Sequence, residues 1–215
     1  MKVGILGSGD VGRSLGTGFS TAGHEVKLGT RHPEQPEIID WVAKTRPNGS
    51  VGSLAESASF GEVLVVATRG VNASDAVRSA GISHFSGKVV IDVTNPLDAG
   101  PNGVPRLARL SSPSNGETLQ ALLPSARVVK AFNIVNHRYM FRPTFPGGPP
   151  DMFIAGNDDA AKTTVGKILG EFGWPSVIDI GPIEGARELE SLCILWVKSA
   201  LKLGNFDIAF KLLGK

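Results

Sequence analysis

The sequence predicts an α/β fold in which a mostly parallel sheet is flanked by helices. Strand-like and helix-like runs alternate from the first residue, which is the pattern of βαβ units. Several strand-like runs are apolar throughout, such as residues 63–66, and this composition suits strands buried on both faces. A glycine-rich turn at residues 7–12 separates the first strand from the first helix.

The elements of the first two thirds of the chain follow this alternation. Strands are predicted at residues 2–6, 25–28, 63–67, 89–93 and 128–131. Helices are predicted between them, at residues 11–22, 37–45, 73–80 and 117–123. Residues 142–150 contain four prolines and two glycines, so this stretch is predicted to be a loop.

One more unit follows that loop. Strands are predicted at residues 152–155 and 177–180, on either side of a helix at residues 158–172, for which Asn157, Asp158 and Asp159 provide a cap and an acidic first turn. A final helix is predicted at residues 184–203. Because this helix is apolar on nearly all sides, we expect it to pack on the sheet and on a second subunit, which predicts a homodimer.

Composition and charge narrow the class of protein. The chain has 215 residues, and its 22 Lys and Arg nearly balance its 20 Asp and Glu, so no basic field favours a nucleic acid as partner. Cys193 is the one cysteine, which fits the reducing cytoplasm, and its apolar neighbours predict a buried residue. We find no signal-peptide region and no apolar run of about 20 residues, so we expect a cytoplasmic protein without a membrane partner.

The glycine-rich turn matches the dinucleotide-binding fingerprint G-x-G-x-x-G. Its residues are Gly7, Ser8, Gly9, Asp10, Val11 and Gly12. An apolar strand precedes the turn and a helix-compatible segment follows, which is the context in which this weak motif indicates a Rossmann-like domain. We expect Gly7 to allow the tight turn, Gly9 to admit a pyrophosphate and Gly12 to let helix and strand pack closely. A carboxylate at Asp10 would repel phosphate, so Asp10 is predicted to cap the helix.

The end of the second strand predicts which dinucleotide binds. NAD-binding sites usually carry an acidic residue there, about 20 residues beyond the glycines. This chain has Thr30, Arg31 and His32 instead. The Arg31 guanidinium can pair with a 2′-phosphate through two charge-assisted hydrogen bonds, so NADP(H) is predicted rather than NAD. His32 is predicted either to contact the adenosine or to be an exposed loop residue.

Three further strand ends are predicted to meet the same ligand, because ligands collect at the carboxyl edge of open α/β sheets. The loop with Ala67, Thr68 and Arg69 follows one strand, and Asn95 follows the next. Thr68 and Asn95 are short polar residues that could contact the ribose or the nicotinamide amide, or else cap turns. A third strand ends with Ala131, Phe132 and Asn133; Phe132 and Asn133 are expected to flank the reacting ring, the alternative being a buried Phe with a turn Asn.

The sequence contains no recognisable hydrolase triad and no set of residues with metal-ligand spacing, so no catalytic side chain and no metal ligand is predicted. No candidate general acid stands out either. A reaction that protonates an alcohol is therefore disfavoured. Hydride transfer to a flavin-like ring demands less of the protein, because the two rings carry the chemistry and the chain mainly aligns them.

Taken together, these motifs make the chain resemble the coenzyme F420-dependent NADP oxidoreductase family, F420 being a deazaflavin. The resemblance rests on residues 7–15, 29–31, 92–96, 129–133 and 185–190, in this order along the chain. The sequence is also similar to the cytosolic NADPH–flavin reductase domains of the six-transmembrane metalloreductases. The deazaflavin reductases tend to carry His where this chain has Asn133, whereas the metalloreductase domains carry Asn.

The resemblance implies a fold, a reaction and a set of contacts. It implies one NADP-binding Rossmann-like domain over residues 1–215, a C-terminal helical segment at residues 184–213 over the active site, and a homodimer. It also implies hydride transfer between NADP(H) and F420 or a flavin such as FMN or FAD. Implied contacts are Ser8 to Val11 at the phosphates, Thr30 and Arg31 at the 2′-phosphate, and Thr68, Asn95, Ala131 and Asn133 around the nicotinamide. Two alternatives stay open: an imine or carbonyl reductase resembling pyrroline-carboxylate or ketopantoate reductases, and an NADPH-binding sensor without turnover.

Overall fold

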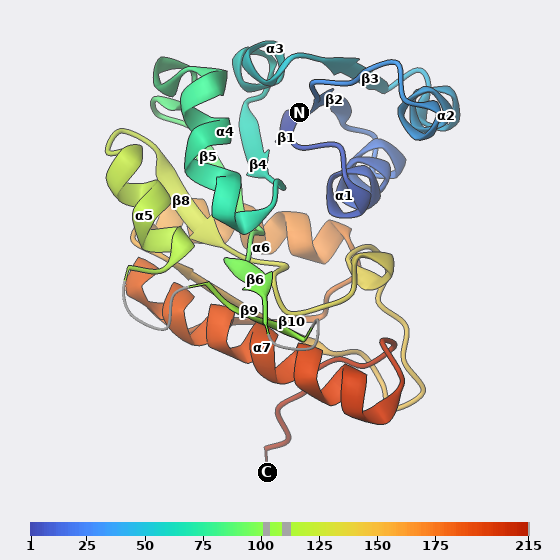
Figure 1. The fold of residues 1–215 in the computed structure, drawn as a ribbon, viewed down its shortest axis with the longest axis vertical. Coiled ribbons are helices and arrows are strands. Elements are labelled where there is room, and N and C mark those ends of the chain that lie inside the picture. Colours follow the sequence, from blue (N-terminus) through green and yellow to red (C-terminus); the bar gives the residue numbers. More distant parts are fainter. Residues whose placement is uncertain (101–103, 109–112, 215) are drawn as a thin grey trace.

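The computed structural model describes residues 1–100, 104–108 and 113–214 and contains an eight-stranded sheet (Figure 1). The strand order is β10-β9-β8-β5-β4-β1-β2-β3, and all neighbouring pairs are parallel except β8 and β9. The strands are β1 (Lys2–Leu6), β2 (Glu25–Gly29), β3 (Gly49–Gly52), β4 (Val63–Val66), β5 (Val89–Asp92), β8 (Arg127–Lys130), β9 (Asp151–Gly156) and β10 (Ser176–Asp179). The predicted mostly parallel α/β fold is confirmed.

Helices cover both faces of the sheet, because alternate side chains of each strand face opposite layers. One core packs α1 and α2 with α6, and the other packs α4 and α5 with residues of α3 (Figure 1). The helices are α1 (Asp10–Thr21), α2 (Pro36–Thr45), α3 (Leu54–Phe60), α4 (Ala73–Ala80), α5 (Asn115–Leu122), α6 (Asp159–Glu171) and α7 (Ala186–Leu203). Short 3-10 turns are η1 (Gly70–Asn72), η2 (Ile82–Phe85), η4 (His137–Tyr139) and η5 (Ile183–Gly185).

The sequence interpretation missed four short elements. They are β3, α3, and a hairpin of β6 (Leu97–Ala99) and β7 (Pro105–Leu107). Strand β3 begins and ends with glycine, which has a low preference for strands, and the hairpin strands have three residues each. Helix α3 did carry a local signal. Ser53 and Glu56 form a reciprocal capping box, a pattern visible in the sequence.

The C-terminal segment is helical over a shorter range than expected. Helix α7 ends at Leu203, and residues 204–214 have no regular structure, so the predicted helical segment 184–213 is wrong beyond residue 203. The tail instead returns to the molecule through backbone carbonyls: Ile208 accepts a hydrogen bond from the Trp196 indole (2.8 Å) and Phe210 accepts one from the Asp151 amide (3.0 Å). These two hydrogen bonds thus connect α7 to the start of β9 through the tail.

Strand order decides where a ligand can bind. Strands β2 and β3 lie on one side of β1, while β4, β5 and β8 lie on the other, so the chain connections reverse direction between β1 and β4. The loops that leave the carboxyl ends of these two strands diverge and leave a crevice. The glycine-rich turn after β1 and the loop after β4 therefore border the same opening. In the part of the chain described, no helix combines the length and apolar character needed to cross a membrane.

Candidate dinucleotide-binding groove

The glycine-rich turn has the geometry that its three glycines predict. Gly7 has φ +118°, and a Cβ there would lie 2.6 Å from the Ala67 carbonyl oxygen. A Cβ at Gly12 would lie 2.1 Å from the Gly7 carbonyl oxygen, so both positions require glycine. Gly9 differs, because no described atom lies within 4 Å of the position its Cβ would take. That open space above the first turn of α1 is the room that a pyrophosphate needs beside the backbone.

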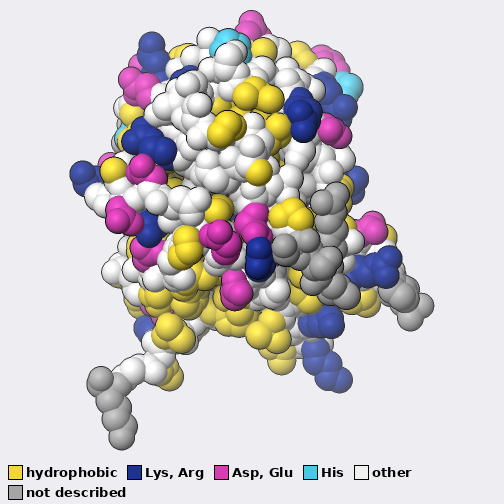
Figure 2. Space-filling view, turned by 90° about the vertical axis from the view of Figure 1, so that its left-hand side faces the viewer, with side chains coloured by type: hydrophobic (Ala, Val, Ile, Leu, Met, Phe, Trp, Pro, Cys, Tyr) yellow, Lys and Arg dark blue, Asp and Glu magenta, His cyan; other side chains and the backbone are white. Residues whose placement is uncertain are grey.

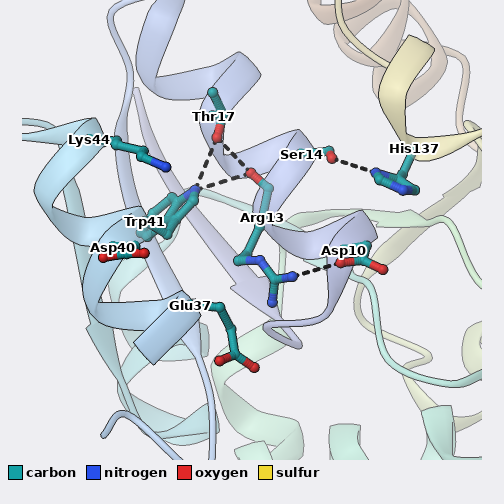
Figure 3. Close-up of a pocket in the computed structure, with 9 residues that line it drawn as sticks. All are labelled: Asp10, Arg13, Ser14, Thr17, Glu37, Asp40, Trp41, Lys44 and His137. Carbon is teal, nitrogen blue, oxygen red and sulfur yellow. Dashed lines mark hydrogen bonds and ion pairs between the residues drawn. The ribbon is translucent and has the colours of Figure 1, made fainter. Parts of the chain in front are cut away.

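Side chains hold the turn from two directions. The Ser8 hydroxyl donates to the Thr30 hydroxyl at the end of β2 (2.9 Å), and the Arg13 guanidinium donates to the Ser8 carbonyl (2.7 Å). Arg13 also pairs with the Asp10 carboxylate (2.6 Å) (Figure 3). The residue at the cap position is Gly9, so the prediction that Asp10 caps α1 is wrong. Its carboxylate is engaged by Arg13 instead.

Arg13 belongs to a separate polar pocket of about 350 Å³ between α1 and α2 (Figure 3). The Trp41 indole forms part of its lining and donates to the Arg13 carbonyl oxygen and to the Thr17 hydroxyl, both at 3.1 Å. At the other side the Ser14 hydroxyl and the His137 ring are 3.0 Å apart. Six of the nine residues that line this pocket thus bind one another in part, while Glu37, Asp40 and Lys44 form no ion pair with a described residue, and the pocket's contact with the groove is the Arg13 bond to Ser8.

The first pocket of the groove, the Arg31 pocket, has a volume of about 480 Å³ and lies beside the end of β2. Predicted residues that line it are Gly7, Ser8, Thr30, Arg31, His32, Thr68 and Arg69. The sequence interpretation missed several polar residues in its lining, namely Gln35, Asn72, Asp75 and Ser79. Gln35 directly precedes α2, Asn72 ends η1, and Asp75 and Ser79 lie on α4, so their side-chain directions become known only once the helices are placed against the sheet.

The charges of the Arg31 pocket favour an anion. Its lining contains two guanidinium groups, Arg31 and Arg69, and one carboxylate, Asp75, and neither guanidinium forms an ion pair with a described residue. His32 is exposed, and its ring lies 3.3 Å from the Glu34 carboxylate. Thr30 and Arg31 directly follow Gly29 at the end of β2, so the position that holds the ribose hydroxyls in NAD-binding sites has a cation beside it in place of an acid.

The second pocket, the Asn95 pocket, has a volume of about 640 Å³ and follows β4 and β5. Val11, Ala67, Thr68, Arg69 and Asn95 are the predicted residues in its lining. The β6–β7 hairpin, absent from the sequence interpretation, adds Leu97, Asp98, Ala99 and Pro105. Since Thr68 and Arg69 line both pockets, the two form one groove that passes the glycine-rich turn at the switch point of the sheet.

Two buried polar atoms have no hydrogen-bond partner among the described atoms, one in a residue that lines the groove and one in a residue bonded to Asn95 behind that lining. They are the Thr68 hydroxyl oxygen and Oδ1 of Asn133. The Asn133 amide nitrogen donates to Oδ1 of Asn95 and to the Leu189 carbonyl, both at 2.9 Å, which fixes the orientation of the amide. Unsatisfied buried polar atoms are costly, and such atoms mark places where a polar ligand can compensate. The lining therefore fits a ligand with hydrogen-bonding groups at this end.

Three of the predicted ring-contacting residues, Ala131, Phe132 and Asn133, are buried and line neither pocket. The Phe132 side chain is 1% exposed, and its ring packs 5.8 Å from the ring of Phe172 in the main core. Ala131 is fully buried as well. The expectation that the Phe132 ring flanks a bound ring is wrong, and the buried alternative holds. Its φ of +60° turns the chain at the end of β8 and leaves Asn133 beside Asn95.

A buried ion triad beneath the Asn95 pocket is the main feature that sequence reasoning missed. The Lys130 ammonium lies 2.9 Å from the Asp92 carboxylate and 2.8 Å from the Glu190 carboxylate, with all three side chains nearly inaccessible to solvent. Burial alone would lower the pKa of Lys130, but the two carboxylates outweigh it and raise that pKa. Burial raises the pKa of Glu190, against the opposing effect of Lys130. The sequence did offer one signal for this triad, because the apolar strands β5 and β8 each end with a charged residue, Asp92 and Lys130.

The fold and the groove define a Rossmann-like dinucleotide-binding protein that carries a cation just after β2, where NAD-binding sites carry an acid. Residues 2–96 match the family described as NADP oxidoreductase, coenzyme F420-dependent. The crystal structure of a provisionally named F420-dependent NADP reductase from Arthrobacter sp. FB24 is 35% identical, has a TM-score of 0.94, and each chain covers 100% of the other. This chain therefore belongs to the coenzyme F420-dependent NADP oxidoreductase family, and its class is that of NADP-dependent oxidoreductases.

Other relatives divide between two activities. The metalloreductase STEAP3 of Rattus norvegicus is 33% identical over 220 residues, which cover 95% of this chain and 40% of the metalloreductase. The chain thus spans about 40% of the length of that relative. The F420-dependent NADP reductase of Methanothermobacter marburgensis is 27% identical over 211 residues and is covered to 93% of its length. An imine reductase from Aspergillus terreus, at 17% identity and a TM-score of 0.67, shares the fold.

Proposed function

We propose that NADPH binds along the groove, with its 2′-phosphate in the Arg31 pocket and its nicotinamide in the Asn95 pocket. The observation that carries this proposal is the open space at Gly9 between two joined pockets, with Arg31 at one end. Backbone amides from Ser8 to Val11 would hold the pyrophosphate, aided by the N-terminal dipole of α1. Thr30 and Arg31 would hold the 2′-phosphate, with His32 beside the adenosine.

We further propose that the protein transfers a hydride between NADP(H) and a flavin or deazaflavin. The nicotinamide supplies the hydride, so this chain has to bind the two rings, orient them and exclude water. Thr68 and Asn95, with Asn133 and the backbone of Ala131 and Phe132 behind them, would orient the nicotinamide. Among the described residues that line the Asn95 pocket, the carboxylic acid is Asp98, which is exposed, and this lining suits a reaction that needs no buried proton donor.

The acceptor class rests on the relatives and on Asn133. Relatives named F420-dependent NADP reductases support a deazaflavin, and relatives named metalloreductases support another acceptor. Asn133 has a buried acceptor oxygen, Oδ1, without a partner among the described atoms, and its amide nitrogen donates to Asn95, which lines the Asn95 pocket. We propose a flavin as acceptor, with F420 as the competing candidate, because reduced flavin carries an N–H at the reacting position and deazaflavin carries C–H there. An N–H group can donate to Oδ1.

The cofactor assignment is tested by Arg31→Ala. Losing a charge-assisted hydrogen bond worth about 1.5–3 kcal/mol raises the Kd of NADPH by roughly 10- to 150-fold and leaves the Kd of NADH within about threefold. Both constants are measured by calorimetric titration. Arg78→Ala is the matched control, because Arg78 is exposed on α4 and does not line the groove. Equal losses for NADPH and NADH in Arg31→Ala would contradict the assignment.

The reaction is tested by following NADPH oxidation with FMN, FAD, riboflavin and F420 in parallel. Turnover with a flavin that exceeds turnover with F420 supports the proposed acceptor, and the reverse order replaces it with the deazaflavin. Oxidation of NADPH by a cyclic imine with none of the four would favour the imine reductase alternative. Tight NADPH binding without oxidation by any acceptor would favour a sensor.

We also propose that residues 1–215 act as one domain that forms a homodimer through α7. Large apolar side chains on α7 and the tail are exposed, including Leu195, Leu201, Leu203 and Phe206. Hydrophobic side chains gather in the lower half of the molecule, the half that contains α7 (Figures 1 and 2). Sedimentation is expected to give twice the chain mass of 22.5 kDa, and Leu201→Glu is expected to shift the species toward 22.5 kDa. A wild-type species of 22.5 kDa would remove this proposal.

A further inference from the structure

The wall of the Asn95 pocket that is made by Gly70, Thr94 and Asn95 is held in place from behind. Each of the three polar groups of Thr94 is bonded. Its amide and its hydroxyl both donate to Oδ1 of Asp92, at 2.9 and 2.7 Å, and its carbonyl accepts from the Lys130 ammonium. Thr94 therefore cannot shift without breaking a bond to the buried ion triad.

A second residue connects this wall to the loop after β4. The Asn115 side-chain amide donates to the Gly70 carbonyl and to the Thr94 hydroxyl, both at 2.8 Å. Asn115 is the first residue of α5, and its backbone amide donates to the Glu190 carboxylate at 2.9 Å. The Asn115 side chain thus joins the loops that follow β4 and β5, and the Asn115 backbone amide is bonded to Glu190 on α7.

Glu190 completes the arrangement from α7. Its carboxylate accepts from Lys130, from the Asn115 amide and, at 3.4 Å, from the Gly116 amide, and it is 3% exposed. Two of the hydrogen-bond partners of the Glu190 carboxylate, Lys130 and Asn115, thus support the wall, while Glu190 itself does not line either pocket. Helix α7 reaches the ring end of the groove through these contacts.

We propose that Glu190 and Asn115 are positioning residues that, through Lys130 and Thr94, set the ring end of the groove without acting on the adenosine end. This inference rests on the proposed binding of NADPH along the groove. The Arg31 pocket shares none of these residues, so a ligand confined to that pocket should be indifferent to them. The nicotinamide should be sensitive, because small displacements of an aligned ring are costly to transfer.

The substitution Glu190→Gln tests this with little change in shape. It removes the charge that holds Lys130 and the α5 amides, and it leaves the Lys130–Asp92 pair intact. Asn115→Ala removes both bonds that join Gly70 to Thr94 and is a second, independent variant. Glu188→Gln is the matched control, since Glu188 lies on α7 and is exposed.

The probes are 2′,5′-ADP, which carries only the adenosine end, and NADPH, whose nicotinamide fluorescence reports on the surroundings of its ring. In both variants we expect the Kd of 2′,5′-ADP to stay within about twofold of wild type. The emission of bound NADPH should move toward that of the free cofactor, and the rate of hydride transfer at saturating NADPH should fall by about tenfold or more. Glu188→Gln should match wild type in all three measurements.

Each other outcome has a defined meaning. If both variants weaken 2′,5′-ADP and NADPH by the same factor, or leave the emission of bound NADPH unchanged, the residues are merely structural and the inference is wrong. If wild-type protein binds neither probe, the proposed function fails, and the inference falls with it. A Glu190→Gln protein that does not fold leaves Asn115→Ala to decide, because its backbone bonds to Glu190 are retained.

Discussion

The two ends of the groove are built in opposite ways. The Arg31 pocket presents long, exposed cations on loops, with Arg31 and Arg69 in no ion pair among the described residues. The Asn95 pocket is backed by a buried triad of one lysine and two carboxylates, and its wall is held by side-chain bonds from Asn115 to Thr94 and from Asn133 to Asn95. The first end presents charge on exposed side chains, whereas the second end is held by many coupled bonds.

This difference indicates which end of the groove should control the affinity for a ligand group and which end should control the alignment of a bound ring. An exposed arginine contributes through one ligand group, so its removal should alter the affinity for that group alone. Removing one partner from a buried network leaves the others unpaired in a medium that solvates charge poorly. Substitutions at the ring end should therefore affect the whole protein, and substitutions at the adenosine end should affect ligand choice.

The largest expected effect is that of Lys130→Met, which leaves Asp92 and Glu190 buried without their cation. The free energy of unfolding should fall by about 3–5 kcal/mol, measured by urea denaturation at pH 7. Lys202→Met, at the exposed end of α7, should stay within about 0.5 kcal/mol of wild type. A Lys130→Met protein as stable as that control would remove the contrast between the two ends.

The next effect is expected at the turn between the ends. Gly9 has φ −69° and open space at its Cβ position, so Gly9→Ala should fold normally. The added methyl group would occupy the space proposed for the pyrophosphate, and the Kd of NADPH should rise about tenfold or more by calorimetric titration. Gly12→Ala is the contrasting variant, since its Cβ would clash with the turn and lower the melting temperature. Unchanged NADPH binding by Gly9→Ala would place the pyrophosphate elsewhere.

Arg69→Ala should give a smaller and less selective effect. Arg69 lines both pockets, so we expect it to lie near the pyrophosphate or riboses that NADPH and NADH share. The Kd values of both cofactors should rise by about three- to tenfold. A loss confined to NADPH would assign Arg69 to the 2′-phosphate beside Arg31 and would extend the adenosine end of the groove.

The smallest effect concerns an ion pair outside the buried network. Hydrogen bonds from Arg187 on α7 lower the pKa of Glu117 on α5 from 4.5 to about 2. A lowered folded-state pKa stabilises the protein above pH 4.5, and that stabilisation is lost as the pH falls toward 2. Denaturation midpoints between these pH values should decrease less steeply in Glu117→Gln than in wild type. Identical pH profiles would show that the pair contributes nothing.

The local parts of the site could be predicted and the distant ones could not. The turn from Gly7 to Gly12 and the cation at Arg31 lie within one βαβ unit, where a fixed spacing carries the geometry. The direction of the Phe132 side chain depends on a positive φ at the end of β8. Phenylalanine rarely adopts a positive φ, so the sequence pattern gave no reason to expect it. The hairpin wall of the Asn95 pocket was too short to recognise.

The sequence by itself determined the alternation of the longer strands and helices, the glycine-rich turn and the cation in place of an acid directly after β2, because these depend on residues close together in the chain. The tertiary structure alone decided that Asp92, Lys130 and Glu190 meet, and that Asn115 joins two loops 24 residues apart, from Gly70 to Thr94. Such contacts arise when distant segments pack against each other. Burial then strengthens the interactions of a charged group, and the position of that group in the sequence does not reveal how deeply it will be buried.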